Sequence, residues 1–73
     1  MQKVSVIIEK DTAGYFAFCP NLPGCQSQGD SMDEAVANIR DAILLYMETL
    51  SPEELSELVS REIFSTTIEV SVA

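Results

Sequence analysis

The chain has 73 residues, 47% of them hydrophobic, and its 12 Asp and Glu outweigh four Lys and Arg to give a formal net charge of −8. This length predicts a single small domain over residues 1–73. The four cations are scattered and form no basic patch that could neutralise phosphates, so we expect no direct nucleic-acid binding. No apolar run reaches the roughly 20 residues of a membrane span, which favours a cytoplasmic protein without membrane contact.

Two strands joined by a tight turn are predicted first. Residues 3–10 alternate branched apolar residues with others, as a strand does. Residues 11–14 form a polar, glycine-ended turn, and residues 15–19 form the second strand. Both faces of the second strand are apolar, so both need cover: Phe16 and Phe18 on one, and Tyr15, Ala17 and Cys19 on the other.

A proline loop follows, reading Pro20-Asn21-Leu22-Pro23-Gly24. Two prolines three residues apart end a strand because they lack the N–H that a sheet needs. Residues 25–28 form a short, polar third strand of the kind found at a sheet edge. Cys19 and Cys25, which flank the loop, are interpreted as small buried apolar residues.

Two helices come next. Ser31 and Glu34 form a predicted capping box at the start of the first. Ser51 followed by Pro52 is the start signal of a second helix that ends near Ser60. The apolar stripe of the first helix is predicted to consist of Met32, Val36, Ile39, Ile43, Tyr46 and Leu50.

Residues 64–72 alternate again and are predicted to form a closing strand. The element order is then β-β-β-α-α-β, an α+β fold. The helices form a right-handed crossover that lets the last strand lie parallel to the first. We therefore expect a four-stranded mixed sheet with spatial order 3-2-1-4 and helices on one face, the first part of a ribonuclease-H-like fold.

The sequence offers little for catalysis. Without histidine, a Ser or Cys nucleophile lacks its usual base, and the three isolated glycines form no phosphate loop. A ribonuclease-H-like sheet would bring Glu9, Glu34 or Asp41, and Glu69 toward a metal site, but 12 acidic residues in 73 supply such a trio by chance. We expect a protein that is not an enzyme and has neither cofactor nor metal.

Residues 15–48 carry a family resemblance. The run through Pro-Asn-Leu-Pro-Gly-Cys, Gln-Gly-Asp-Ser, Glu-Ala and Ala-Asn-Ile resembles the N-terminal domain of HicB-type antitoxins, in a short form without the DNA-binding segment. The resemblance implies the same partial ribonuclease-H-like fold. It also implies an antitoxin of a type II toxin–antitoxin system that binds and neutralises a HicA-type, mRNA-cleaving toxin. The family usually has an aspartate where this chain has Asn21. The alternative is an orphan structural or regulatory module that self-associates without a toxin.

Two surfaces are expected to contact other chains. The stiff loop and Asp30 are the predicted partner-binding site, comprising Pro20, Asn21, Leu22, Pro23, Gly24 and Asp30. Leu22 either is exposed there or folds back onto the sheet. A homodimer or higher assembly is predicted through the outer sheet face and the last strand, with contacts from Ile7, Tyr15, Ala17, Ile68 and Val70. The acidic chain suits a basic toxin.

Overall fold

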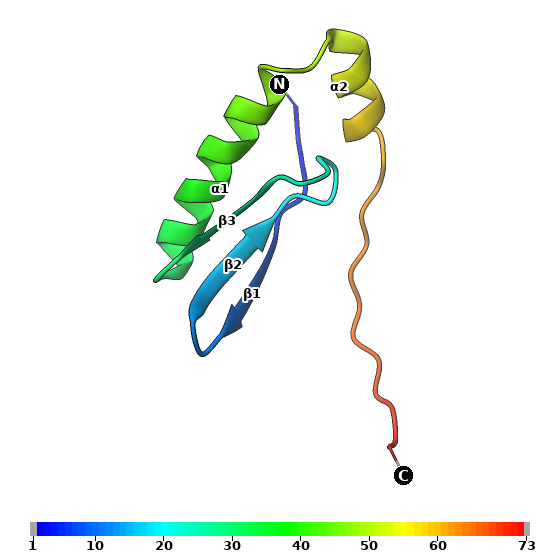
Figure 1. The fold of residues 1–73 in the computed structure, drawn as a ribbon. Coiled ribbons are helices and arrows are strands. Elements are labelled where there is room, and N and C mark those ends of the chain that lie inside the picture. The colour runs from blue at the N-terminus through cyan, green and yellow to red at the C-terminus, as the bar shows by residue number, and fades with distance from the viewer. Residues whose placement is uncertain (1, 73) are drawn as a thin grey trace.

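The computed structural model describes residues 2–72 and has three strands followed by two helices (Figure 1). The elements are β1 (Ile7–Asp11), β2 (Gly14–Phe18), β3 (Gln26–Gly29), α1 (Met32–Met47) and α2 (Pro52–Val59). α1 covers one face of the sheet, where it packs on β2 and β3. Neither α1 nor α2, the helices of the described chain, is long and apolar enough to cross a membrane.

The sheet is antiparallel throughout, with the strand order β1-β2-β3. The predicted hairpin is present, since Asp11 pairs with Gly14 at the turn between β1 and β2. Gly14 has φ +135°, and a Cβ there would lie 3.0 Å from the carbonyl oxygen of Gly29 on β3. Glycine therefore suits this position, because it adopts positive φ without cost and leaves room for β3.

The core lies between α1 and the sheet face beneath it. α1 approaches closely because small residues meet there: a Cβ on Gly29 would lie only 2.6 Å from the backbone nitrogen of Ala35. The centre of the predicted α1 stripe is confirmed, whereas Met32 and Val36 at its margin remain 50% and 46% exposed. The buried hydrophobic residues of the core are Ala17, Cys19, Leu22, Cys25, Ala35, Ile39 and Ile43.

Both helices are capped by the predicted serines, but the capping box expected at Ser31 and Glu34 is only half formed. Ser31 Oγ accepts a hydrogen bond from the Glu34 backbone N–H at 3.1 Å. At α2 the capping box is complete, because Ser51 Oγ accepts from the Glu54 N–H at 3.1 Å and Glu54 Oε1 accepts from the Ser51 N–H at 2.9 Å. The bond from the Ser51 backbone, followed by that of its side chain, holds the pKa of Glu54 below its usual value.

The predicted closing strand is not part of the sheet. Residues 64–72, which we call the tail, run away from α2 without pairing to any strand of residues 2–72 (Figure 1). The expected four-stranded mixed sheet with order 3-2-1-4 is therefore wrong, and so is the parallel strand that would make it ribonuclease-H-like. The alternation of the tail is that of a strand, but a strand also needs a neighbour for its backbone groups.

Candidate protein-binding surface

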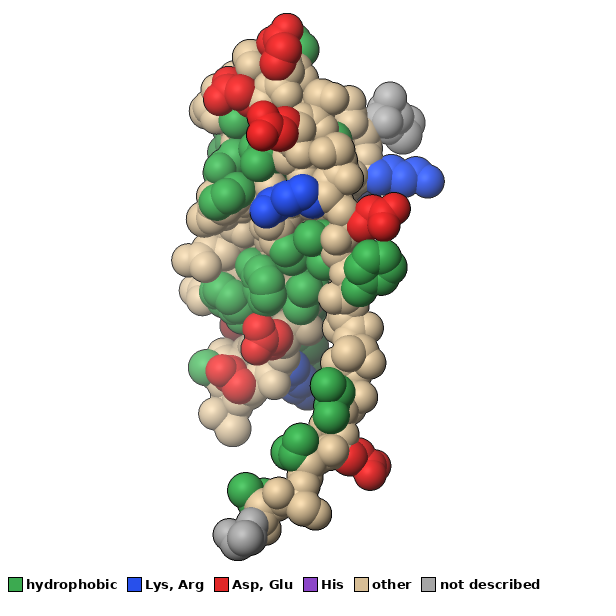
Figure 2. All heavy atoms as spheres, turned by 90° about the vertical axis from the view of Figure 1, so that its right-hand side faces the viewer, with side chains coloured by type: hydrophobic (Ala, Val, Ile, Leu, Met, Phe, Trp, Pro, Cys, Tyr) green, Lys and Arg blue, Asp and Glu red, His purple; other side chains and the backbone are tan. Residues whose placement is uncertain are grey.

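The sheet face turned away from α1, which we call the open face, has an apolar centre and a polar margin. Phe16 on this face is 38% exposed, and its ring lies 6.1 Å from that of Phe18 at a tilt of 36°. Figure 2 views the molecule from the side of the tail and shows hydrophobic side chains gathered at mid-height, with acidic side chains above and below them. Strand alternation assigns these residues to the open face: Ile7, Glu9, Asp11, Phe16, Phe18, Gln26 and Gln28.

A hollow of about 370 Å³ joins the open face to the proline loop. The loop is closed by backbone bonds, since the Cys19 N–H donates to the Cys25 carbonyl at 3.0 Å and the Cys25 N–H donates to the Leu22 carbonyl at 3.0 Å. Gly24 takes φ +80° at the exit of the turn. The loop is therefore held in one shape and extends the apolar surface of β2. The lining residues are Phe16, Phe18, Cys19, Pro20, Pro23, Gly24, Cys25 and Gln26.

Asn21 fixes the loop to both ends of the chain. Its side chain is 2% exposed, and its Oδ1 accepts from the Ser5 N–H at 3.0 Å. Its Nδ2 donates to the carbonyls of Leu58 and Arg61, both at 3.2 Å. Arg61 Nη2 in turn donates to the carbonyls of Pro20 at 2.8 Å and Asn21 at 3.0 Å. We call this arrangement the Asn21 junction.

The junction explains asparagine at a position where the resemblance leads one to expect aspartate. An amide both donates and accepts, whereas an ionised carboxylate only accepts. A carboxylate at position 21 would face the Leu58 and Arg61 carbonyls without a proton to offer them. Asn21 therefore serves the fold of the loop, a role that depends on residues 37 and 40 positions away and that local sequence reasoning missed.

The structure separates the six predicted partner-binding residues into three groups. Leu22 and Asn21 are buried, so Leu22 takes the second of its two alternatives and folds back onto the core. Pro23 and Gly24 are exposed and Pro20 is half-buried, and all three line the hollow. Asp30 is exposed but lies at the opposite end of the sheet, beside Gly29.

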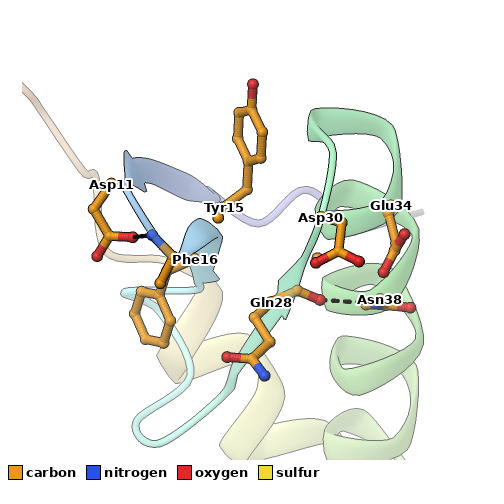
Figure 3. Close-up of a pocket in the computed structure, with 10 residues that line it drawn as sticks. Asp11, Tyr15, Phe16, Gln28, Asp30, Glu34 and Asn38 are labelled. Carbon is orange, nitrogen blue, oxygen red and sulfur yellow. Dashed lines mark hydrogen bonds between the residues drawn. The ribbon is translucent and has the colours of Figure 1, made fainter.

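Asp30 belongs to a second hollow, of about 590 Å³, between the hairpin turn and the start of α1 (Figure 3). In Figure 3 the carboxylates of Asp30 and Glu34 lie close together beside Asn38, which donates to the Gln28 carbonyl at 2.7 Å. No group of three or more His, Cys, Asp or Glu within residues 2–72 is placed to hold a metal ion. These carboxylates provide negative charge at one end of the sheet.

The predicted dimer contacts fall on three different surfaces. Ile7 lies on the open face, where it pairs with Phe18. Tyr15 and Ala17 lie on the opposite face, packed in the core, and Ala17 has no exposed surface. We expected Tyr15 and Ala17 to lie on the outer face of β2. Instead, α1 packs on their face, where Ala17 and Cys19 are small, and Phe16 and Phe18 lie on the outer face. The remaining two predicted contacts, Ile68 and Val70, are exposed in the tail.

Cys19 and Cys25 are free thiols in the core, as predicted from their small apolar character. Burial raises the pKa of the Cys25 thiol, and the neighbouring Cys19 raises it further. A thiol whose pKa is raised stays protonated and is a poor nucleophile. Cys25 is therefore a poor nucleophile, and the burial of both cysteines shows that they contribute packing behind the loop.

Comparison with known proteins places the chain in a family. The model of the HicB-like antitoxin of bacterial toxin–antitoxin systems matches residues 4–70. This match covers most of the chain, which therefore belongs to the HicB-like antitoxin family.

Curated relatives support the assignment. A UPF0150 protein of Helicobacter pylori is 46% identical over 70 residues, covering 96% of this chain and 97% of that protein. A UPF0150 protein of Synechocystis is 54% identical over 50 residues, covering 67% of this chain and 63% of that protein. A UPF0150 protein of Archaeoglobus fulgidus is 37% identical over 62 residues, covering 84% of this chain and 90% of that protein. No solved structure matches the chain.

Proposed function

We propose that this chain is the antitoxin of a type II toxin–antitoxin system and that it binds and neutralises a HicA-type, mRNA-cleaving toxin. The family match over residues 4–70 carries the proposal. Family membership suggests an antitoxin, which acts by binding rather than by catalysis. The resemblance of residues 15–48 to HicB-type antitoxins is the reason for proposing a HicA-type toxin as the partner.

We assign the open face and the proline loop to the toxin. Exposed aromatic side chains in a rigid setting supply much of the energy of many protein interfaces, and Phe16 with Phe18 beside the hollow meets this description. The loop is already ordered by its own hydrogen bonds and the Asn21 junction. Little conformational entropy is then lost when Pro20 and Pro23 contact a partner.

Charge favours the same surface. Glu9 and Asp11 flank its aromatic centre, and the hollow at Asp30 and Glu34 extends the negative margin. A toxin that cleaves mRNA needs cations to hold phosphates, so the two proteins attract each other over a distance. Bound in this way, the antitoxin covers the basic RNA surface of the toxin and excludes its substrate.

Co-expression with a HicA-type toxin, encoded by a small basic reading frame beside this one, tests the proposal. We expect growth to be restored, a purified complex of the two chains, and loss of RNA cleavage by the toxin. The absence of both a complex and growth rescue would overturn the proposal and leave the orphan self-associating module.

The variant Phe16→Asp tests the assigned surface. Loss of an aromatic centre and addition of a charge at the contact should weaken toxin binding at least about 30-fold, equivalent to roughly 2 kcal/mol. Leu45→Asp, at a 65% exposed position on the outer side of α1, is the matched control and should bind as the natural chain does. Titration calorimetry measures both. Equal affinity of the two variants would place the toxin on another surface.

A further inference from the structure

The tail has the pattern of a strand and an exposed apolar face. One side of the strand carries Phe64, Thr66, Ile68, Val70 and Val72, four of them apolar, and these alternate with Ser65, Thr67, Glu69 and Ser71. The nine residues span about 30 Å when extended. Ile68 is 76% exposed and Val70 79% exposed. The radius of gyration is 14.3 Å, against about 11 Å for a compact domain of this length, because the tail lies off the body (Figure 1).

The tail also belongs to the family domain. The family match extends to residue 70, and the Helicobacter pylori relative aligns over 96% of the chain. A run of exposed apolar side chains within a domain indicates a surface that another chain covers. The start of the tail is fixed, since Arg61 is held at the Asn21 junction by two hydrogen bonds.

A matching surface lies at the free edge of the sheet. β1 is an edge strand whose outer side pairs with nothing in the described part of the chain. Beside it, between α1 and the chain from Gln2 to Ile8, lies an apolar groove of about 840 Å³, which we call the edge groove. Val36 and Leu44, which line it on α1, are 46% and 55% exposed. α1 packs on β2 and β3, so this side of the helix projects beyond the sheet.

We propose that two copies of this chain form a homodimer by reciprocal exchange of their tails. The tail of each copy adds as a strand to the β1 edge of the other and covers its edge groove. The pairing supplies partners for the backbone groups of both strands, and the apolar side chains of the tail enter the groove. One contact is made twice around a two-fold axis, as in other dimers that exchange an identical element.

Charge supports a second copy as the occupant. Lys3 and Arg40, two of the four cations in the chain, lie at the edge groove. Glu69 is the only charged residue of the tail; it alternates with Ile68 and Val70, so it faces away from the groove and attracts Lys3 and Arg40 over a distance rather than by contact. The rest of this acidic chain offers the tail few other cations.

The exchange leaves the open face uncovered, because the edge groove lies on the α1 side of the sheet. The dimer and the proposed toxin complex therefore use different surfaces. Failure of one proposal leaves the other standing, and Phe16→Asp should dimerise as the natural chain does.

Sedimentation equilibrium of the full chain between about 1 and 100 µM tests the exchange. We expect a dimer with twice the 8.0 kDa chain mass. Ile68→Lys in the tail and Leu44→Glu in the groove should each weaken dimerisation at least tenfold. Both residues are exposed in the single chain, so circular dichroism should show an unchanged fold. The matched controls Thr67→Lys and Leu45→Glu, at neighbouring positions outside the contact, should dimerise normally.

Mixing separates exchange from other dimers. An equimolar mixture of Ile68→Lys and Leu44→Glu chains retains one natural tail and one natural groove in each mixed pair, and its altered tail and groove carry opposite charges. We therefore expect the mixture to recover dimer that neither variant forms alone. A monomeric natural chain at 100 µM, a dimer insensitive to both substitutions, or a mixture that stays monomeric would overturn the proposal. So would a tail that becomes ordered only when a toxin is added.

Discussion

The Asn21 junction and the tail are almost adjacent in the chain, yet they differ in burial and in hydrogen bonding. At the junction the carbonyls of Leu58 and Arg61 accept from a buried amide, and the Arg61 side chain closes the loop. A few residues later, Phe64 is 85% exposed and Val72 is 93% exposed. The junction finds all its partners within its own chain, whereas the tail has a strand pattern without a neighbouring strand. The alternating sequence of the tail favours an extended conformation, but a neighbouring strand is needed to stabilise it.

Truncation of a buried side chain should show the largest contrast between the two regions. Leu22 has no exposed surface, so Leu22→Ala leaves a cavity beneath the loop and should cost about 3 kcal/mol of the free energy of unfolding. Val70→Ala in the tail should cost less than about 0.5 kcal/mol at concentrations where the chain is monomeric. Urea denaturation measures both. Equal losses would mean that the tail is packed in the single chain.

Asn21→Asp tests the hydrogen bonds of the junction, with a smaller effect. The substitution removes two donors and sets a charge against two carbonyls, so we expect a loss of about 2 kcal/mol. Asn38→Asp is the matched control, because Asn38 makes a single hydrogen bond near the surface and its loss should cost about 1 kcal/mol or less. Thermal unfolding at neutral pH distinguishes them. A neutral effect of Asn21→Asp would contradict the role of the amide.

Acid should loosen the α2 side of the junction slightly. The folded pKa of Glu54 lies below its ordinary value of 4.5, so its carboxylate stabilises α2 above that pH, and this contribution is lost as the pH falls through the lowered folded pKa. Glu54→Gln removes the titration. The natural chain should therefore melt at a higher temperature than Glu54→Gln at neutral pH, and the difference should close in acid. A difference independent of pH would exclude the carboxylate.

The features that sequence predicted well are those set by neighbouring residues. The glycine-ended hairpin, the loop between Pro20 and Pro23, and the caps at Ser31 and Ser51 depend on local backbone chemistry. The first strand is shorter than expected and begins at Ile7. Among the predicted contact residues, Pro20, Pro23 and Gly24 of the loop and Ile7 of β1 lie at least partly exposed on the candidate surface, as the sequence led us to expect.

The errors concern contacts between distant residues. Both faces of β2 are apolar, so alternation alone could not say which face α1 covers. The size of the side chains could have identified the face that α1 covers, since Ala17 and Cys19 leave room for Ala35 of α1, whereas Phe16 and Phe18 do not. The pairing of residues 64–72 failed for a related reason: their alternation is clear, but nothing in it identifies the neighbouring strand.

Amide hydrogen exchange, at a dilution where sedimentation shows a monomer, tests the contrast between junction and tail most directly. We expect the amides of Leu22 and Cys25, bonded inside the loop, to be protected, and those of residues 64–72 to exchange at the rates of an unstructured chain. At higher concentration, protection of the tail should appear together with the dimer. Protection of residues 64–72 in the monomer would contradict the account, because the tail would then have its partner within its own chain.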